Sequence, residues 1–308
     1  MRLKTAVLCC ISLTIIICSC SRKNGDVYLG QKPPGRTPEV LAPGIVSTDD
    51  FEFCTGFLKK GTVFIFKRQK RIDRDFYSAP TCLTELKNGK WTEPEILPFN
   101  DYYPFNFTTA PDNKSLYFTS KCSNIIKDNS LHATIWTVSL TENGWNKPVK
   151  LDYPVNTEYS DSYPSLTRDG TLYFMSTREG GYGSTDIYRS ELEEGKYLNV
   201  ENLGRPVNTE DRELDPAVAP DESYIIFCAE KDEGFGSHDL YITFRKSDNS
   251  WTVPANMGVG INTPESENRA NITSDGKYII FMRGTIEKAN IYWVDAGIIE
   301  EMKPKELK

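Results

Sequence analysis

Two groups of residues in this chain have types and spacings that could carry chemistry. Ser237, His238 and Asp239 are consecutive, and together they supply the three side chains of a serine-hydrolase triad. Neighbouring side chains on an extended segment point to opposite faces, so three consecutive residues cannot relay a proton. The chain also contains no Gly-x-Ser-x-Gly motif and only two histidines. These residues therefore do not predict serine hydrolysis.

The second group consists of carboxylates that recur with a fixed period. Asp161, Glu213 and Glu267 follow one another at intervals of 52 and 54 residues, and Glu52 and Asp101 lie near the corresponding places earlier in the chain. Each of them precedes an expected strand. If these strands surround an axis, the acids would line one mouth of a central channel and attract a cation or a basic segment. Five such residues are our candidate ligand-binding positions.

Three further interpretations of these acids stay open. A ring of oxygens is the ligand type that Ca²⁺ prefers. Two carboxyl groups at the right separation would suit a glycosidase, and the sequence cannot give that separation. Alternatively each acid is structural and pairs with a basic residue of a neighbouring repeat. Arg178 and Arg283 are the candidate partners.

Asp186 and Asp239 also recur with the period of the repeat. We expect each carboxylate to accept backbone N–H bonds and to fix the loop around it.

An internal repeat must position all of these residues. Five turn sequences, 52–57 residues apart, mark its copies: Lys60-Gly61, Asp112-Asn113, Asp169-Gly170, Asp221-Glu222 and Asp275-Gly276. Asp-Gly and Asp-Asn favour tight hairpins, because Gly and Asn adopt positive φ and Asp caps its own turn. Runs typical of a second, third and fourth strand follow each turn in most copies, and a proline in three of the fourth strands suits an outer edge.

Four antiparallel strands in each of five copies predict an all-β propeller with five blades. Six blades are the alternative, if residues 26–47 and the tail build a further one. The last copy lacks a fourth strand, and residues 39–47 are expected to pair there and close the ring. The expected segments are a signal peptide at 1–19, a flexible tether at 20–38, the propeller at 39–301 with blades at about 48–98, 99–151, 152–204, 205–258 and 259–301, and a polar tail at 302–308.

The N-terminus has the pattern of a targeting segment. Arg2 and Lys4 precede an apolar stretch from Ala6 to Ile17 that is too short to span a bilayer. The stretch resembles a bacterial lipoprotein signal, and this resemblance implies that Cys20 becomes lipidated and anchors the chain. A serine rather than an aspartate follows Cys20, as in lipoproteins sorted to an outer membrane. A plain secretory signal is the alternative.

Charge and cysteine usage limit the remaining classes. The net charge of −7 argues against nucleic acid as a partner, because phosphate backbones need clustered Lys and Arg. Beyond the anchor, the cysteines are Cys54, Cys82, Cys122 and Cys228, and they lack the Cys-x-x-Cys spacing of zinc sites. We expect small buried thiols, with a disulfide among the four as the alternative.

Residues 163–301 resemble a known repeat family. The segments "TRDGTLYFMSTREGGYGSTDIY", "APDESYIIF" and "SDGKYIIF" are similar to the WD40-like, TolB-type propeller repeat called PD40, found in envelope proteins of Bacteroidetes-type bacteria. The resemblance implies a non-catalytic lipoprotein without a cofactor, facing the periplasm, whose channel mouth binds an envelope protein or peptide. The runner-up is a carbohydrate-active or peptide-cleaving propeller with a glycan or peptide as its ligand.

Overall fold

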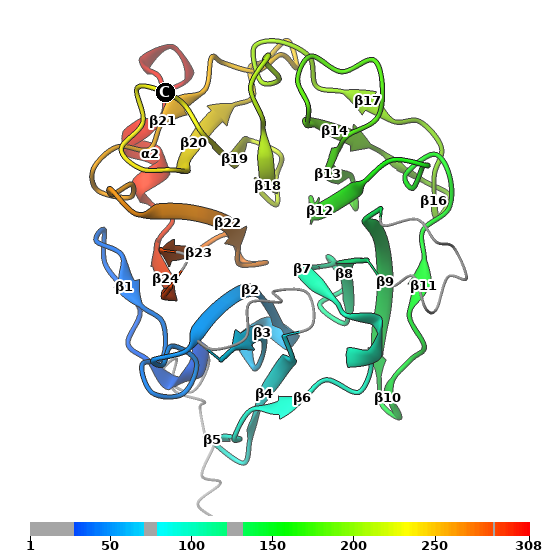
Figure 1. The fold of residues 1–308 in the computed structure, drawn as a ribbon, viewed down its shortest axis with the longest axis vertical. Coiled ribbons are helices and arrows are strands. Elements are labelled where there is room, and N and C mark those ends of the chain that lie inside the picture. The colour runs from blue at the N-terminus through cyan, green and yellow to red at the C-terminus, as the bar shows by residue number, and fades with distance from the viewer. Residues whose placement is uncertain (1–27, 71–78, 122–131, 286) are drawn as a thin grey trace, which may run out of the picture.

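Five antiparallel sheets are arranged radially about a central axis (Figure 1). The computed structural model describes residues 28–70, 79–121, 132–285 and 287–308. In this part of the chain, the only α-helix is the short α2 (Ile298–Met302). The sequence prediction of an all-β propeller with five blades is confirmed, and the six-bladed alternative is not.

Each of the first four blades begins with its innermost strand and adds strands outward (Figure 1). Blade 1 contains β2 (Phe51–Leu58), β3 (Val63–Gln69), β4 (Thr81–Lys87) and β6 (Glu95–Ile96). Blade 2 contains β7 (Phe105–Thr109), β8 (Ser115–Ser120), β9 (Thr134–Thr141) and β11 (Val149–Lys150). Blade 3 contains β12 (Asp161–Leu166), β13 (Leu172–Ser176), β14 (Asp186–Ser190) and β17 (Glu201–Asn202). Blade 4 contains β18 (Leu214–Val218), β19 (Tyr224–Ala229), β20 (Asp239–Phe244) and β21 (Ala255–Asn256). Short hairpin strands extend three blades: β5 (Lys90–Trp91), β10 (Gly144–Trp145), β15 (Leu192–Glu193) and β16 (Lys196–Tyr197).

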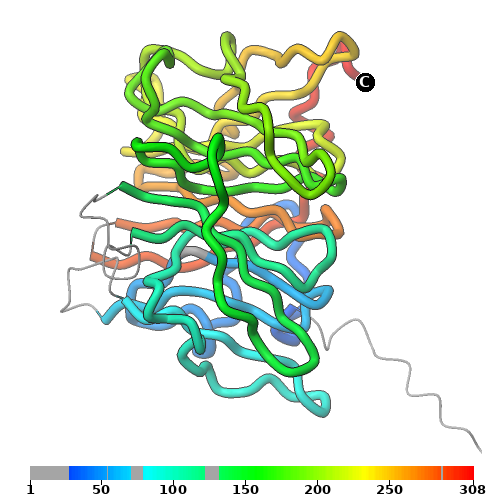
Figure 2. The backbone as a smooth tube through the Cα atoms, turned by 90° about the vertical axis from the view of Figure 1, so that its right-hand side faces the viewer, coloured from blue at the N-terminus to red at the C-terminus, as the bar shows by residue number. Residues whose placement is uncertain are grey.

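The two ends of the chain share blade 5 and close the ring. Its strands are β22 (Ser266–Ile272), β23 (Tyr278–Gly284), β24 (Ala289–Asp295) and β1 (Glu39–Val40). Strand β1 pairs antiparallel with β24, with Glu39 opposite Trp293. Figure 2 shows the blue N-terminal segment beside the red C-terminal strands. The N-terminal segment therefore supplies the missing fourth strand, as the sequence predicts.

The turns between first and second strands have the predicted conformation in four blades. The residues with positive φ are Asn113 (55°), Gly170 (94°), Glu222 (61°) and Gly276 (73°). The aspartate before each of them accepts a backbone N–H bond from two residues further along the chain. The first blade differs, because its turn forms the 3-10 helix η2 (Lys59–Gly61).

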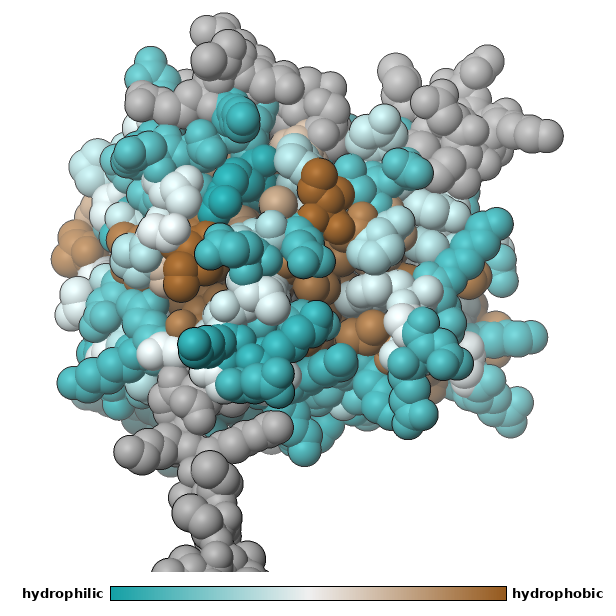
Figure 3. Space-filling view, turned by 90° about the horizontal axis from the view of Figure 1, so that it is seen from below, coloured by the Kyte–Doolittle hydropathy of each residue, from teal (hydrophilic) through white to brown (hydrophobic). Residues whose placement is uncertain are grey.

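The core is divided into five apolar clusters, one between each pair of neighbouring blades. The cluster between blades 5 and 1 contains Phe64, Phe66 and Trp293, all 0% exposed. The buried apolar side chains thus pack mainly between neighbouring sheets. On the edge of the ring seen in Figure 3, the surface is mostly hydrophilic and hydrophobic residues appear in small groups.

Both ends of the propeller are packed more closely than the sequence indicates. Within the expected tether, η1 (Tyr28–Gly30) is docked: the Tyr28 ring lies 5.1 Å from those of Phe57 and Tyr278, and its hydroxyl donates to Asp275 at 2.9 Å. At the other end, η4 (Lys305–Leu307) brings Leu307 onto the cluster between blades 4 and 5, so the tail is not purely polar. The signal peptide and Cys20 lie outside the described residues. No helix in the described part is long and apolar enough to cross a membrane.

Candidate functional site in the central channel

Four of the five candidate acids are buried inside their blades. Glu52, Asp161, Glu213 and Glu267 are each 0% exposed. Each carboxylate accepts two bonds, from the backbone N–H and the hydroxyl of a threonine four residues earlier, at 2.5–3.1 Å. These bonds tie the connector that precedes each innermost strand to the start of that strand. The carboxylates therefore do not form an exposed rim.

Three of these acids also bind an arginine of their own blade. The pairs are Glu52–Arg68 at 3.2 Å, Asp161–Arg178 at 2.7 Å and Glu267–Arg283 at 2.8 Å. The sequence-based alternative placed the partner in a neighbouring blade. The partner is instead in the same blade, because the antiparallel register puts the start of the first strand beside the end of the second. Each arginine also donates to backbone carbonyls of the connector.

Glu213 and Asp101 differ from the other three acids. At the place of Arg178, blade 4 has Lys231, which pairs with Asp211 at 3.5 Å. Burial raises the pKa of Glu213, and the bonds from Thr209 oppose that shift. Asp101 lies exposed in η3 (Asn100–Tyr102).

A second set of residues recurs with the period of the repeat and joins neighbouring blades. These residues were not identified from the sequence. Asn156, Asn208 and Asn262 place their side-chain amides along the third strand of the preceding blade, bonding both the N–H and the C=O of one residue at 2.8–2.9 Å. An Asn-Thr pair recurs in all three connectors and is the signal that could have identified them.

The structural expectation for Asp186 and Asp239 is confirmed. Asp186 accepts the backbone N–H groups of Tyr182 and Gly183 at 2.7 and 3.1 Å, and Asp239 makes the equivalent two bonds. Because the Asp239 carboxylate is engaged by its own loop, it does not orient His238. The three consecutive residues Ser237 to Asp239 therefore do not form a proton relay.

Three cavities follow the channel and share lining residues. The hairpin-side cavity, about 190 Å³, lies at the turns between first and second strands. A narrow space of about 30 Å³ follows. The connector-side cavity, about 340 Å³, lies at the opposite mouth, where the connectors enter the innermost strands. None of the five candidate acids lines any of the three.

Bulges in the innermost strands shape the narrow part of the channel. All five strands shift register at mid-strand. In four of them the bulged residue has positive φ: Asn106 (51°), Tyr163 (56°), Asp215 (55°) and Arg269 (50°). A bulge re-aims the side chain it carries. All four residues line the narrow space.

Cationic and hydroxyl side chains dominate the polar lining of the connector-side cavity. The cationic residues Lys121, Arg212 and Arg269 line it together with the imidazole of His238, and Asp215 is its only carboxylate among the described residues. Asp215 is also the only carboxylate among the described residues that line the narrow space, and the described lining of the hairpin-side cavity contains none. Glycoside hydrolysis uses a pair of carboxyl groups, and the described residues that line these cavities include no such pair.

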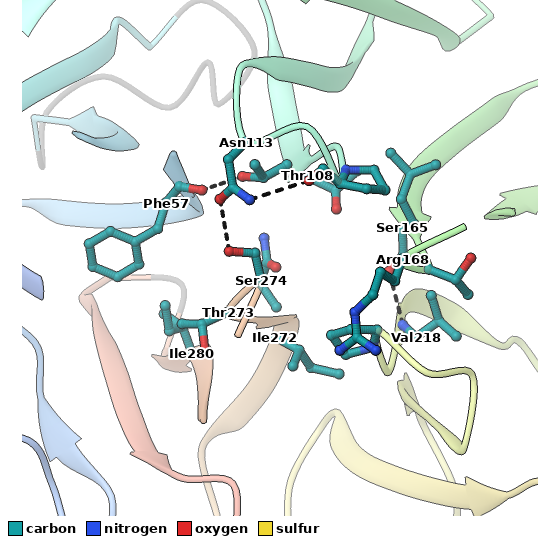
Figure 4. A pocket seen from close by; sticks show the side chains of 16 residues that line it. Phe57, Thr108, Asn113, Ser165, Arg168, Val218, Ile272, Thr273, Ser274 and Ile280 are labelled. Atoms are coloured by element: carbon teal, nitrogen blue, oxygen red, sulfur yellow. Dashed lines mark hydrogen bonds between the residues drawn. The ribbon is translucent and has the colours of Figure 1, made fainter. Parts of the chain in front are cut away.

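The hairpin-side cavity has a more neutral lining (Figure 4). Asn113 and Ser274 are joined by a hydrogen bond of 2.9 Å, and Ser165 accepts the backbone N–H of Val218 at the same distance. Arg168 is the one charged side chain among the described residues of this lining, and it is exposed. Most polar groups here are already bonded to the protein.

Two cysteines are buried free thiols, as one sequence interpretation expects. They are Cys82 and Cys228. The Cys228 thiol donates to Asp215 at 3.5 Å, and burial raises the pKa of both groups. Cys122 lies outside the described residues, and the side chain of Cys54 is not described. No group of three or more potential metal ligands occurs in the described part of the chain.

Comparison with known proteins gives a likeness of fold. No family model and no curated protein matches the sequence. A protein assigned as TolB from Agrobacterium tumefaciens superposes with a TM-score of 0.51 at 12% identity, over 80% of this chain and 78% of that one. The exo-β-1,3-galactanase 1,3Gal43A from Clostridium thermocellum gives 0.50 at 14% identity, over 83% of this chain and 62% of that one. These likenesses show the fold alone. One TolB-type protein and one glycosidase thus share it, so function must be argued from the channel.

Proposed function

We propose that this protein is a lipid-anchored binding protein of a bacterial envelope, and that its propeller holds a protein or peptide partner at the connector-side mouth. The proposal combines the lipoprotein-like N-terminus, the PD40-like repeats and the TolB-like fold with one structural observation. That observation is the connector-side cavity of about 340 Å³, whose volume lies within the range of ligand pockets.

The rest of the molecule supports a scaffold role. The asparagine amides fix each connector to the preceding blade, and the carboxylate–threonine bonds fix it to the following one. The mouth is therefore preorganised, which lowers the entropic cost of binding. In our proposal, the buried acids that recur in each blade keep the mouth rigid. The partner binds on the channel axis, between the blades that carry them.

Site-specific photo-cross-linking tests the binding mouth. Ser237 is exposed and precedes His238 in the cavity lining, so p-benzoylphenylalanine at this position reports on a bound partner. The same residue in place of Arg168 reports on the opposite mouth. In membranes of the source cells, we expect a discrete protein adduct from position 237 and none from 168. Adducts from 168 alone, or no adduct from either, would overturn the proposal, as would hydrolysis of a glycan or peptide by the purified protein.

Replacing Cys20 tests the anchor. Acyl chains supply membrane affinity through burial of their methylene groups, and stable anchoring needs more than one chain. Cys20→Ala should abolish incorporation of labelled palmitate and move the protein to the soluble fraction or leave it unprocessed. The matched change Cys18→Ala should leave labelling intact. Undiminished labelling of the Cys20 variant would refute lipidation at this residue.

A further inference from the structure

We infer that the connector-side cavity recognises a carboxylate, and that the partner inserts an acidic peptide segment into it. The inference rests on the proposed function and specifies the chemistry of the same mouth. It reverses the polarity expected from the sequence, in which the periodic acids would attract a basic segment.

The charged side chains of the lining favour an anionic ligand. Arg212 is exposed at the cavity, and in the described part of the chain its guanidinium has no hydrogen bond or ion pair. The Arg269 side chain lies over the Phe53 ring at 5.4 Å and donates to Asn268 at 3.1 Å. The single carboxylate, Asp215, accepts the Arg269 backbone N–H at 3.1 Å and the thiol bond described above. It is therefore engaged at the cavity floor.

A buried hydroxyl in the same cavity offers a hydrogen bond to a ligand. Thr185 is 4% exposed and lines the cavity, and its Oγ1 has no hydrogen-bond partner among the described residues. A buried hydroxyl without a partner is costly and rare, and a ligand commonly supplies the missing bond. The Thr185 carbonyl accepts the backbone N–H of Glu213 at 3.3 Å, and a parallel bridge aligns Thr185 with Arg212. The wall of the connector-side cavity thus carries a neutral donor, the Thr185 hydroxyl, next to a cationic donor, the Arg212 guanidinium.

These donors match a carboxylate. Arginine binds a carboxylate through two parallel charge-assisted bonds, and a hydroxyl donates readily to one of the two oxygens. A basic ligand would meet the like charges of Arg212 and Arg269, and the one acid among the described lining residues, Asp215, is already engaged. The volume of the cavity admits a few peptide residues, so an acidic side chain or a chain terminus fits the mouth.

Fluorescence anisotropy with three labelled peptides tests the inference on the full-length protein in detergent. The probes are hexaglutamate, hexaglutamine and hexalysine, at about 50 mM salt, where screening is weak. Hexaglutamate should bind, and the other two should not. Hexaglutamate with an amidated C-terminus separates the two carboxylate sources: unchanged affinity assigns recognition to side chains, and lost affinity assigns it to the terminus. Preferential binding of hexalysine, or equal binding of all three peptides, would overturn the inference.

Three variants locate the site. Arg212→Ala should weaken hexaglutamate binding at least tenfold, because hydrogen bonds to charged groups contribute about 1.5–3 kcal/mol. Arg168→Ala removes the same charge at the opposite mouth and should leave affinity within about twofold, since the charge is distant and screened. Thr185→Val keeps the side-chain shape, so it should weaken binding severalfold while the denaturation midpoint stays unchanged or rises. A fall in midpoint with unchanged affinity would assign Thr185 a purely structural role and exclude its hydroxyl from ligand binding.

The two proposals fail in different ways. If position 237 yields a partner adduct that hexalysine blocks and hexaglutamate does not, the mouth binds a partner and the carboxylate inference is wrong. If hexaglutamate binds in an Arg212-dependent manner but no protein adduct forms in membranes, the carboxylate site stands and the protein-binding function fails.

Discussion

A buried carboxylate can be a ligand site or a structural joint, and its hydrogen bonds distinguish the two. In three blades an arginine shares the acid with the threonine, whereas Glu213 lacks that arginine. Burial is the largest cause of its raised pKa, so the native state holds this proton to a higher pH than the unfolded chain does. Glu213 is therefore the one of these four acids that has no arginine partner among the described residues.

We expect Glu213→Gln to change how stability depends on pH. The wild-type contribution of Glu213 is fully present below its ordinary pKa of about 4.3 and is lost as the pH rises through the raised value. The variant lacks this pH-dependent contribution, so its stability relative to wild type should improve as the pH rises from about 4 to 8. Urea unfolding at a series of pH values measures the difference in free energy of unfolding between the two proteins. A constant difference, or a trend in the other direction, would show that burial does not dominate.

Asn208→Ala should destabilise the protein by about 1–3 kcal/mol, because it leaves the buried N–H of Ile187 without a partner. It also removes one of the two bonds that the Ile187 carbonyl accepts, while the bond from the backbone N–H of Leu203 stays. Urea unfolding measures the change. Asn146 is exposed and its side chain makes no hydrogen bond with the described residues, so Asn146→Ala should have little effect. Equal effects of the two changes would show that the amide does not clamp blades 3 and 4.

At the scale of elements, the sequence predicts position along a strand better than the direction of a side chain. Turn chemistry located the hairpins, and the missing fourth strand predicted the closure by β1. Periodicity also found Asp161 and its equivalents, but not that they turn into the blade. The face of the sheet to which a side chain points depends on the strand register. A mid-strand bulge alters that register without a strong sequence signal. Polar composition likewise concealed the docking of Tyr28 and Leu29.

The closing strand gives an element-scale prediction. Leu41 follows β1, is 0% exposed and donates its backbone N–H to Ile291 at 2.8 Å. Leu41→Ala should cost about 2–5 kcal/mol, as expected for a large-to-small change in a core. Ile45 in the same segment is 39% exposed, and Ile45→Ala should cost less than about 1 kcal/mol. Chemical unfolding compares the two, and similar values would argue that the segment does not hold the ring closed.

At the scale of the whole molecule, each blade depends on both neighbours. The apolar surface lies between sheets, so no single blade has a core of its own. The net charge is −7, yet the charged side chains that line one channel mouth are, among the described residues, the cationic Lys121, Arg212 and Arg269 against a single acid, Asp215. The local field there is therefore set by the few residues around the axis rather than by overall composition.

This dependence predicts one cooperative transition. The five tryptophans lie in blades 1, 2, 4 and 5, so their fluorescence reports on most of the ring. Fluorescence and far-UV circular dichroism should give coincident urea curves, as for a two-state unit. Separate midpoints would indicate that groups of blades unfold independently.

The bulged residues separate what the scaffold requires from what the channel presents. The left-handed conformation recurs at Asn106, Tyr163, Asp215 and Arg269, although the four side chains are an amide, a phenol, an acid and a base. The backbone tolerates such different side chains at equivalent positions of four blades. Substitutions there can therefore change which ligands the channel selects while the blades stay intact. Related propellers can thus acquire new specificities by changing a handful of axial positions.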